Sequence, residues 1–441
     1  MGRRRDEREL RTKSSRRPVP PATLVLHVGV IGAFLLLSLI IWGHVWFTGH
    51  PTHTITCQCG DPAEEVWWFE WLPWAVLHGH NPFFTNALYA GNGGVNALAN
   101  VSVMLPALML SPVTLLFGPI ATFNVAATLS PIISGYCMFL LVRKFTRFAP
   151  APVLAGLLWG FSPSVIDWLP FGHLVDVLGF FLPLAGLVVY DLLIDHNRPP
   201  WVDGILLGVL AIAQFFTSTE VLGIVVVTAP AGVAVAIVLA YRIIWANRRA
   251  LCIAAGSALA MAGALLAYPA WFAVAGPRHV VGPPWVDNAQ GELLSAIVNP
   301  GPGDHLRTTG LGQLAGYWGA RGPYYGYLGW GVLVFIAISF PVWRKTILAW
   351  CAVATGVWAW ALSWGVPAFG SGWRPWSVFN AMPVVSDIRP FRFTDVVAFS
   401  AALLLAICLD GWWKLATAKA ALRRSRARSF LGSCSELCPS P

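Results

Sequence analysis

Residues 60–71 read GDPAEEVWWFEW, which places four carboxylates and four aromatic rings close together in a chain otherwise poor in charge. Asp61 and Pro62 are typical of a helix start, because aspartate caps the first backbone amides and proline is tolerated in the first turn. Asp61, Glu64 and Glu65 have the i, i+3, i+4 spacing of one helix face. We therefore expect a helix at the membrane surface with these acids toward water. The tryptophans expected to face the lipid headgroups are Trp67, Trp68, Trp71 and Trp74.

The segment before this stretch is apolar and long enough to cross a bilayer. Residues 22–47 exceed the roughly 20 residues that a spanning helix needs, whereas the apolar part of a cleavable signal has about 7–15. Of the 441 residues, 56% are hydrophobic and 11% are charged, while soluble domains have about 25% charged residues. The sequence therefore predicts an all-α polytopic membrane protein whose first span is not cleaved.

Apolar runs separated by polar turns predict about ten spans in the transmembrane domain, residues 22–413. After the first span, the expected spans are 120–142, 149–164, 173–193, 201–216, 221–241, 251–272, 327–341, 347–364 and 396–413. The outer loops are expected at 48–118, which carries interfacial helices, and at 276–325 and 366–393.

Residues 101–117 admit two interpretations. They are apolar enough for a short eleventh span, which would move the following Arg143, Lys144 and Arg147 to the outer side. As a helix at the membrane surface, they would leave these three positive charges inside. Because positive charge in short loops marks the cytoplasmic face, we favour the interfacial helix.

The net charge of +9 has a topological explanation. In the ten-span topology, all but six of the 29 lysines and arginines lie on the cytoplasmic side, in agreement with the positive-inside rule. The basic tails, residues 1–21 and 414–441, are both expected in the cytoplasm, and the second is expected to be unfolded. The charge therefore requires no nucleic-acid partner, and we expect a multi-pass protein of the plasma membrane.

Asp61 is the most specific candidate for chemistry in the first outer loop. It stands between Gly60 and Pro62, so the backbone restricts it more than an acid on an open helix face. It would serve as a general base or as a metal ligand beside the lipid. Glu64 and Glu65 are candidate ligands for an acceptor or a metal. The alternative is that these acids only keep a surface helix hydrated.

Three further ionisable groups lie at the outer ends of expected spans, where such groups are functional candidates. His173 and Asp176 are three residues apart and form either an acid–base or metal-binding pair or a simple capping pair. Glu220 closes a polar turn and either lines a cavity or marks a membrane boundary. A divalent cation such as Mg or Mn is a candidate cofactor for Asp61, Glu64 and His173, although no ligand spacing here is strong.

The last outer loop contains two arginines, Arg389 and Arg392, on the side that is normally short of them. A guanidinium group binds a phosphate through two parallel hydrogen bonds. These two residues are therefore candidate ligands for the phosphate of a donor substrate. The alternative is that they form salt bridges with Asp387 or Asp395.

The order of these features resembles the GT-C superfamily of membrane glycosyltransferases. One span leads into an outer loop with an early acid, Asp61, followed by the pattern Ala75, Gly79, Asn81 and Pro82. Next come a proline-bearing segment that ends at Phe117-Gly118, a span that ends at Arg143-Lys144, and an alanine-rich hairpin from Ala149 to Pro163. The resemblance is best over residues 20–200.

The resemblance implies a polyprenyl-phosphate sugar as donor, a cell-envelope glycan or glycolipid as acceptor, and transfer at the outer face with inversion of the anomeric centre. It implies that Asp61 is the catalytic base and that a second acidic site lies near Asp167, His173 and Asp176. Two other classes stay open: a lipid or glycolipid transporter without chemistry, and a scaffold for envelope assembly. A transporter predicts polar groups through the membrane midplane, whereas most acids here lie at the outer edge.

Overall fold

The computed structural model describes most of the chain. The described residues are 21–47, 49–55, 60–88, 90–98, 103–168, 173–279, 291, 297–298, 326–366, 373–380, 382 and 385–436. Within these ranges, the side chains that are not described are those of residues 21–22, 60–61, 167–168, 175–176 and 422–436. The described part is mostly helical. Its one sheet is an antiparallel pair, β1 (Phe84–Thr85) and β2 (Val95–Asn96), with Phe84 opposite Asn96.

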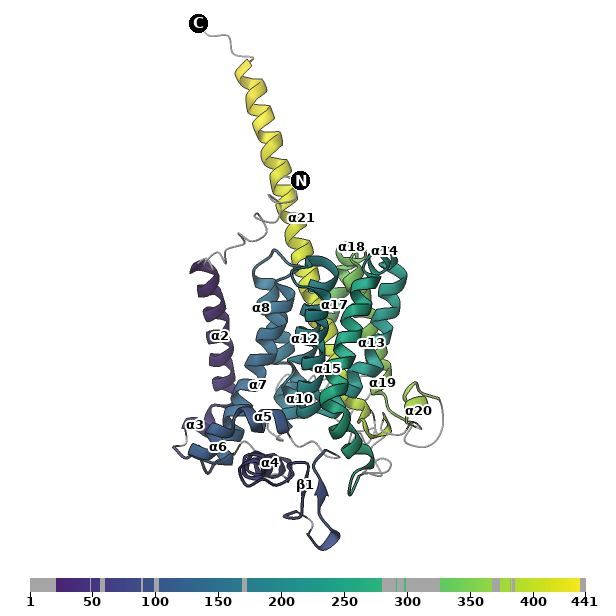
Figure 1. Ribbon diagram of the computed structural model, residues 1–441. Coiled ribbons are helices and arrows are strands. Elements are labelled where there is room, and N and C mark those ends of the chain that lie inside the picture. The colour runs from purple at the N-terminus through teal and green to yellow at the C-terminus, as the bar shows by residue number, and fades with distance from the viewer. Residues whose placement is uncertain are drawn as a thin grey trace, which may run out of the picture.

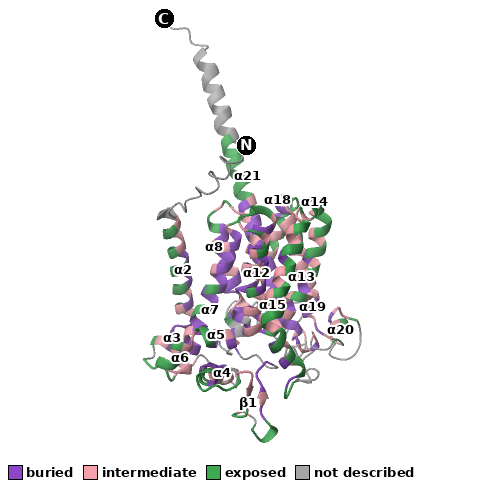
Figure 2. Cartoon of the chain, viewed as in Figure 1, coloured by how far each residue is buried: buried purple, intermediate pink, exposed green. Residues whose placement is uncertain are grey.

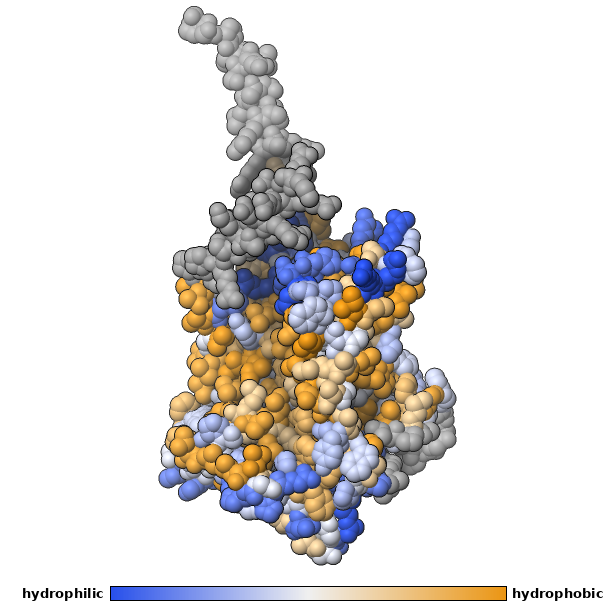
Figure 3. Space-filling model, viewed as in Figure 1, coloured by the Kyte–Doolittle hydropathy of each residue, from blue (hydrophilic) through white to orange (hydrophobic). Residues whose placement is uncertain are grey.

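Long apolar helices form an upright bundle (Figure 1). Six helices of the described ranges are long and apolar enough to cross a membrane: α2 (Pro21–Trp42), α7 (Pro119–Val142), α12 (Pro200–Thr217), α13 (Thr219–Leu239), α15 (Arg248–Ala275) and α21 (Thr394–Glu436). On the face that Figure 3 displays, hydrophobic side chains form a band between two more hydrophilic ends. Together these features identify a helical membrane protein.

Six helices of spanning length are fewer than the ten or eleven spans expected from the apolar runs. Two further runs form the shorter apolar helices α8 (Pro150–Gly160) and α19 (Ile347–Ser363). The runs 173–193 and 327–341 are broken. They contain α10 (Leu174–Val177), α11 (Phe181–Tyr190), the π-helical turn Asp191–Asp195, α17 (Trp330–Ile338) and α18 (Phe340–Trp343). An apolar run predicts burial in lipid or protein, but it does not predict where a buried helix breaks.

Short elements lie across one end of the bundle, which we call the α4 end (Figure 1). α4 (Gly60–Leu77) confirms the helix expected around Pro62, and it lies crosswise to the upright helices. Beside it lie α3 (His44–Phe47), α5 (Met104–Met109), α6 (Ser111–Phe117) and the β1–β2 pair. Because α5 and α6 are separated at Leu110 and each is too short to span a bilayer, residues 104–117 agree with the interfacial interpretation.

The remaining short elements connect the bundle helices. They are η1 (Ala90–Asn92), α9 (Pro163–Trp168), α14 (Tyr241–Ala246), α20 (Trp376–Phe379), η4 (Val385–Asp387) and η5 (Pro390–Phe393). α14 and α18 lie at the end opposite α4, whereas α20 lies toward the α4 end (Figure 1).

Burial is concentrated in a few helices (Figure 2). In the most apolar window of each helix, 72% of the residues are buried in α7 and 78% in α21, but only 17% in α2 and 6% in α15. The inner helix α7 carries the fully buried Phe123, Met138 and Phe139. α2 and α15 instead expose leucine, isoleucine and valine side chains, as helices in contact with lipid do. The core of the protein therefore lies between α7, α8, α19 and α21.

The expectation of an unfolded tail after Lys414 is wrong for the backbone. α21 continues as a helix to Glu436 and leaves the bundle at the end opposite α4 (Figure 1). Residues 414–428 are rich in alanine, leucine, lysine and arginine, which all favour helix. Since the buried part of α21 already supplies the helical nucleus, adding further turns costs little.

Candidate functional site

Four segments that are far apart in the sequence meet at the α4 end. They are α4, the 173–180 segment, the turn between α12 and α13, and η5 just before α21. Each brings at least one ionisable residue that the sequence singles out as functional: Glu65, His173, Glu220, and Arg389 with Arg392. The contacts between these four segments define the candidate site.

Arg392 is at the centre of the group. The residue is only 4% exposed, and its guanidinium Nη1 forms an ion pair with Oε2 of Glu220. The other carboxylate oxygen, Oε1, accepts a hydrogen bond of 2.7 Å from the backbone amide of Arg389. Nη2 of Arg392 lies 3.5 Å from Nδ1 of His173. The sequence expectation named Asp387 and Asp395 as salt-bridge partners, and it missed Glu220 because that residue lies 172 positions away.

The short helix η5 holds Arg392 against the bundle. Pro390 occupies its first position and restricts the backbone there. Phe393 is fully buried and packs against Trp376, with 5.2 Å between the ring centroids. Phe391 is also buried, in the same apolar cluster as aromatic residues of α4. Because the rings on both sides of Arg392 are anchored, its guanidinium group cannot easily swing into water.

Glu220 is positioned by the turn that starts α13. It lies in the first helical turn, where the helix dipole favours a negative charge. Ser218 is the N-cap, and its hydroxyl accepts a hydrogen bond of 3.2 Å from the amide of Val221. Gln214 of α12 is fully buried and donates from Nε2 to the carbonyl of Ser218 at 3.2 Å. The carboxylate is therefore presented by a turn that is fixed on both sides.

The 173–180 segment is held by two side chains of the bundle. Ser134 of α7 donates to the carbonyl of Val177 at 2.8 Å and accepts from the amide of Gly179 at 2.7 Å. Trp159 of α8 donates from Nε1 to the carbonyl of Gly179 at 2.8 Å. The backbone passes so close to this indole that a Cβ at position 179 would lie 2.5 Å from the ring. The close approach accounts for the glycine.

Glu65 ties α4 to the same segment. The residue is 6% exposed, and Oε2 accepts a hydrogen bond of 3.3 Å from the amide of Leu174. The expectation that the acids of α4 face water is therefore wrong for Glu65, and two of the tryptophans expected at the headgroups are buried. The buried residues of α4 include Glu65, Trp68, Phe69, Leu72 and Ala75. This spacing is that of one helix face, and it includes an acid.

Of the other acids named from the sequence, the structure describes the side chain of Glu64 but not those of three aspartates. The side chains of Asp61, Asp167 and Asp176 lie outside the described residues. The backbone of Asp61 belongs to α4, one helical turn before Glu65. Glu64 has a partner within α4, since its Oε1 accepts a hydrogen bond of 3.3 Å from Nε1 of Trp68.

The described residues contain no cluster of three or more histidine, cysteine, aspartate or glutamate side chains suited to a metal ion. Glu64 and His173 have the partners given above, in α4 and at Arg392 respectively. The side chain of the third expected ligand, Asp61, lies outside the described residues. A divalent cation therefore stays a prediction of the sequence.

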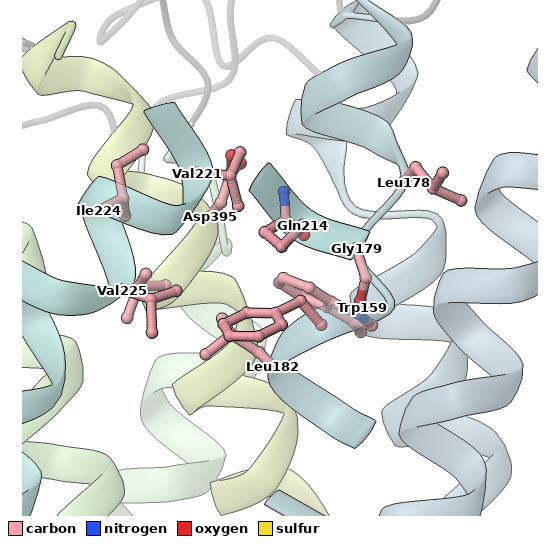
Figure 4. A pocket seen from close by; sticks show the side chains of 11 residues that line it. Trp159, Leu178, Gly179, Leu182, Gln214, Val221, Ile224, Val225 and Asp395 are labelled. Atoms are coloured by element: carbon pink, nitrogen blue, oxygen red, sulfur yellow. Dashed lines mark hydrogen bonds between the residues drawn. The ribbon is translucent and has the colours of Figure 1, made fainter. Parts of the chain in front are cut away.

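A small cavity of about 20 Å³ lies beside the site, which is room for about one water molecule. Its lining includes Gln214 of α12, Asp395 of α21 and Trp159 of α8, among apolar side chains (Figure 4). Within the described part of the chain, Oε1 of Gln214 is buried and has no hydrogen-bond partner. Sequence reasoning missed Gln214, although an amide inside an apolar span was the signal that could have found it.

Asp387 of η4 lies near the site in sequence, two residues before Arg389. Burial raises the pKa of its carboxyl group above the ordinary value, and a weak hydrogen bond of 3.5 Å from the Ser386 hydroxyl opposes this effect. Burial has this effect because it disfavours the charged form of the carboxyl group. The carboxyl group of Asp387 therefore takes up its proton at a higher pH than an unperturbed aspartate does.

Comparison of the chain with models of protein families, with curated proteins and with solved structures finds no match.

Proposed function

We propose that this protein is a membrane glycosyltransferase that transfers a sugar from a polyprenyl-phosphate donor to a cell-envelope glycan or glycolipid. The observation that supports this proposal is the meeting of Glu65, His173, Glu220 and Arg392 at one end of a membrane bundle. Ionisable groups buried at a membrane edge are costly and are usually kept for function. A transporter would instead need polar groups along a path through the bundle.

In this proposal the chain has the GT-C arrangement, with about ten spans in the plasma membrane and both termini in the cytoplasm. The α4 end then faces outward, where the lipid-linked donor and the acceptor meet. This orientation agrees with the many basic residues near α14, α18 and the protruding part of α21, at the opposite end. The broken runs 173–193 and 327–341 would cross the bilayer as non-continuous helices, which protein neighbours make tolerable.

The reaction assigns a role to each group. Asp61 accepts the proton of the acceptor hydroxyl, whose oxygen then forms a bond to the anomeric carbon of the sugar. The bond from that carbon to the phosphate oxygen breaks, and polyprenyl phosphate leaves with the bonding electrons. Arg389 and Arg392 stabilise the negative charge that develops on the leaving phosphate. Attack opposite the leaving group inverts the anomeric centre.

Replacement of Asp61 by asparagine tests this assignment. Asp61→Asn removes the proton acceptor with little change in size, so sugar transfer should fall by about 10²–10⁴-fold. Transfer is measured from a radiolabelled lipid-linked sugar in membranes that contain equal amounts of each variant. Glu70→Gln is the matched control, because Glu70 is an exposed acid on the same helix and should give wild-type transfer.

Two results would count against the proposal. Unchanged transfer by Asp61→Asn would exclude Asp61 as the base while leaving the enzyme class open. A lipid-linked and envelope glycan profile that stays the same when the gene is deleted would exclude glycosyl transfer, and a transporter or scaffold would then be favoured.

A further inference from the structure

The carboxylate of Glu220 occupies a set of donors that suits an oxyanion. One oxygen accepts a hydrogen bond of 2.7 Å from the backbone amide of Arg389, and the other forms an ion pair with the guanidinium group of Arg392. A backbone amide beside a guanidinium is the combination that proteins use for phosphate groups, because both are directional donors and one carries a positive charge. In the structure, an internal side chain fills the place where these donors point.

We infer that Glu220 is a placeholder for the phosphate of the donor substrate, and that the phosphate binds by displacing this carboxylate from Arg389 and Arg392. The inference rests on the proposed function, since it takes the donor to be a polyprenyl-phosphate sugar. It adds to that function the location of the phosphate subsite and the residue that competes for it.

Burial decides which partner moves. The side chain of Arg392 is 5% exposed and that of Glu220 is 13% exposed, so the carboxylate is nearer to water. Glu220 also follows Thr219, an exposed residue at the start of α13, and a change of rotamer there would bring the carboxylate toward solvent. Arg392 lies between two anchored phenylalanines and stays in place.

Exchange of one anion for another avoids an uncompensated charge. Removing one partner of a buried ion pair is strongly unfavourable, because the charge left behind has lost both water and its counter-ion. When a phosphate replaces Glu220, Arg392 keeps a negative partner throughout. His173, whose Nδ1 lies 3.5 Å from Arg392 Nη2, borders the same donor set and would contact the incoming group.

The placeholder has a measurable effect on affinity. A ligand that must displace an internal group binds more weakly than one that finds its donors open, by the fraction of time for which the site is competent. Removing the charge of Glu220 should therefore strengthen binding of a lipid phosphate. If Glu220 were instead a ligand of the donor, the same change would weaken binding.

The experiment uses the full chain in lipid nanodiscs, with farnesyl phosphate as probe and empty nanodiscs subtracted, and measures Kd by calorimetry. Glu220→Gln should lower Kd by about tenfold, because the amide keeps the size of the side chain but no longer competes as an anion. Arg392→Lys should raise Kd by about tenfold, because an ammonium group cannot donate the two parallel hydrogen bonds that a guanidinium group donates to a phosphate. Glu70→Gln on α4 is the control and should leave Kd unchanged.

The outcomes separate this inference from the proposed function. If the wild type binds farnesyl phosphate and Glu220→Gln binds it equally well or more weakly, the placeholder inference is wrong. The assignment of a lipid-phosphate donor is not affected by that result. Absence of farnesyl phosphate binding by the wild type and by Glu220→Gln overturns the donor assignment as well. If Glu220→Gln does not fold, a wild-type structure with farnesyl phosphate decides. The carboxylate must have left Arg392, and a retained Glu220–Arg392 pair contradicts the inference.

Discussion

At the scale of single residues, Glu65 is the acid whose role the structure changes most. Its carboxylate accepts a hydrogen bond from the backbone amide of Leu174, and both residues are buried. Glu65→Ala removes this acceptor, so the free energy of unfolding should fall by about 1–3 kcal/mol. Glu65→Gln keeps an acceptor and should lose less. Thermal unfolding in detergent measures both variants, and equal midpoints for the alanine variant and the wild type would exclude a structural role for this bond.

The sequence predicts which ionisable residues belong to the site, but not which of them are in contact. Charge at the membrane edge was enough to single out His173, Glu220 and Arg392, because such residues are rare in apolar surroundings. Their mutual contacts were not predictable, since the Glu220–Arg392 pair depends on how α13 packs beside η5. For Glu65 the sequence predicts contact with water, whereas the structure buries it. Helical spacing defines a face, but only packing decides whether that face meets water.

At the scale of elements, the 173–180 segment fits only because one of its residues has no side chain. Gly179→Ala would place a methyl group 2.5 Å from the Trp159 ring, so the segment or the ring must move. Overpacking of this kind should cost about 1–3 kcal/mol of unfolding free energy. The measurement is the thermal midpoint in detergent, together with sugar transfer, because a displaced segment also displaces His173.

Gly29→Ala on α2 is the matched control for that change. A Cβ at Gly29 meets no atom within 4 Å, and alanine is the better helix former, so this variant should be neutral or more stable by up to about 1 kcal/mol. Equal effects of the two variants would show that the close contact at Gly179 is unimportant.

Hydropathy predicts the long helices of this protein well, but it does not predict where a helix is broken. The long uninterrupted apolar runs predict long helices, and the structure confirms six of them as α2, α7, α12, α13, α15 and α21. The run 173–193 predicts a single helix, but the helix is broken at residues 178–180, where Ser134 and Trp159 form hydrogen bonds with the backbone of Gly179. Such replacement partners come from other helices, so they leave no signal in the run itself.

At the scale of the whole molecule, α21 divides into a part that the bundle needs and a part that it does not. Residues 396–410 are mostly buried, whereas residues 412–421 are exposed. Deletion of residues 422–441 should therefore change the unfolding free energy by less than about 1 kcal/mol, a shift of a few degrees in the midpoint.

Deletion from residue 401 onward is the contrasting variant. It removes the fully buried Ala402, Ala406 and Cys408, so the protein should fail to accumulate in membranes. A stable protein after this deletion, or an unfolded one after removal of residues 422–441 alone, would contradict the division of α21.

The distance along the chain between Glu220 and Arg392 also has a consequence for biosynthesis. Arg392 is added 172 positions after Glu220, which at about 5–20 residues per second takes roughly ten to thirty-five seconds. During this interval Glu220 does not yet have Arg392 as its partner, and the helix dipole at the start of α13 is what favours its negative charge. The Glu220–Arg392 pair can therefore form only after most of the bundle has been synthesised, when the segment just before the last helix is added.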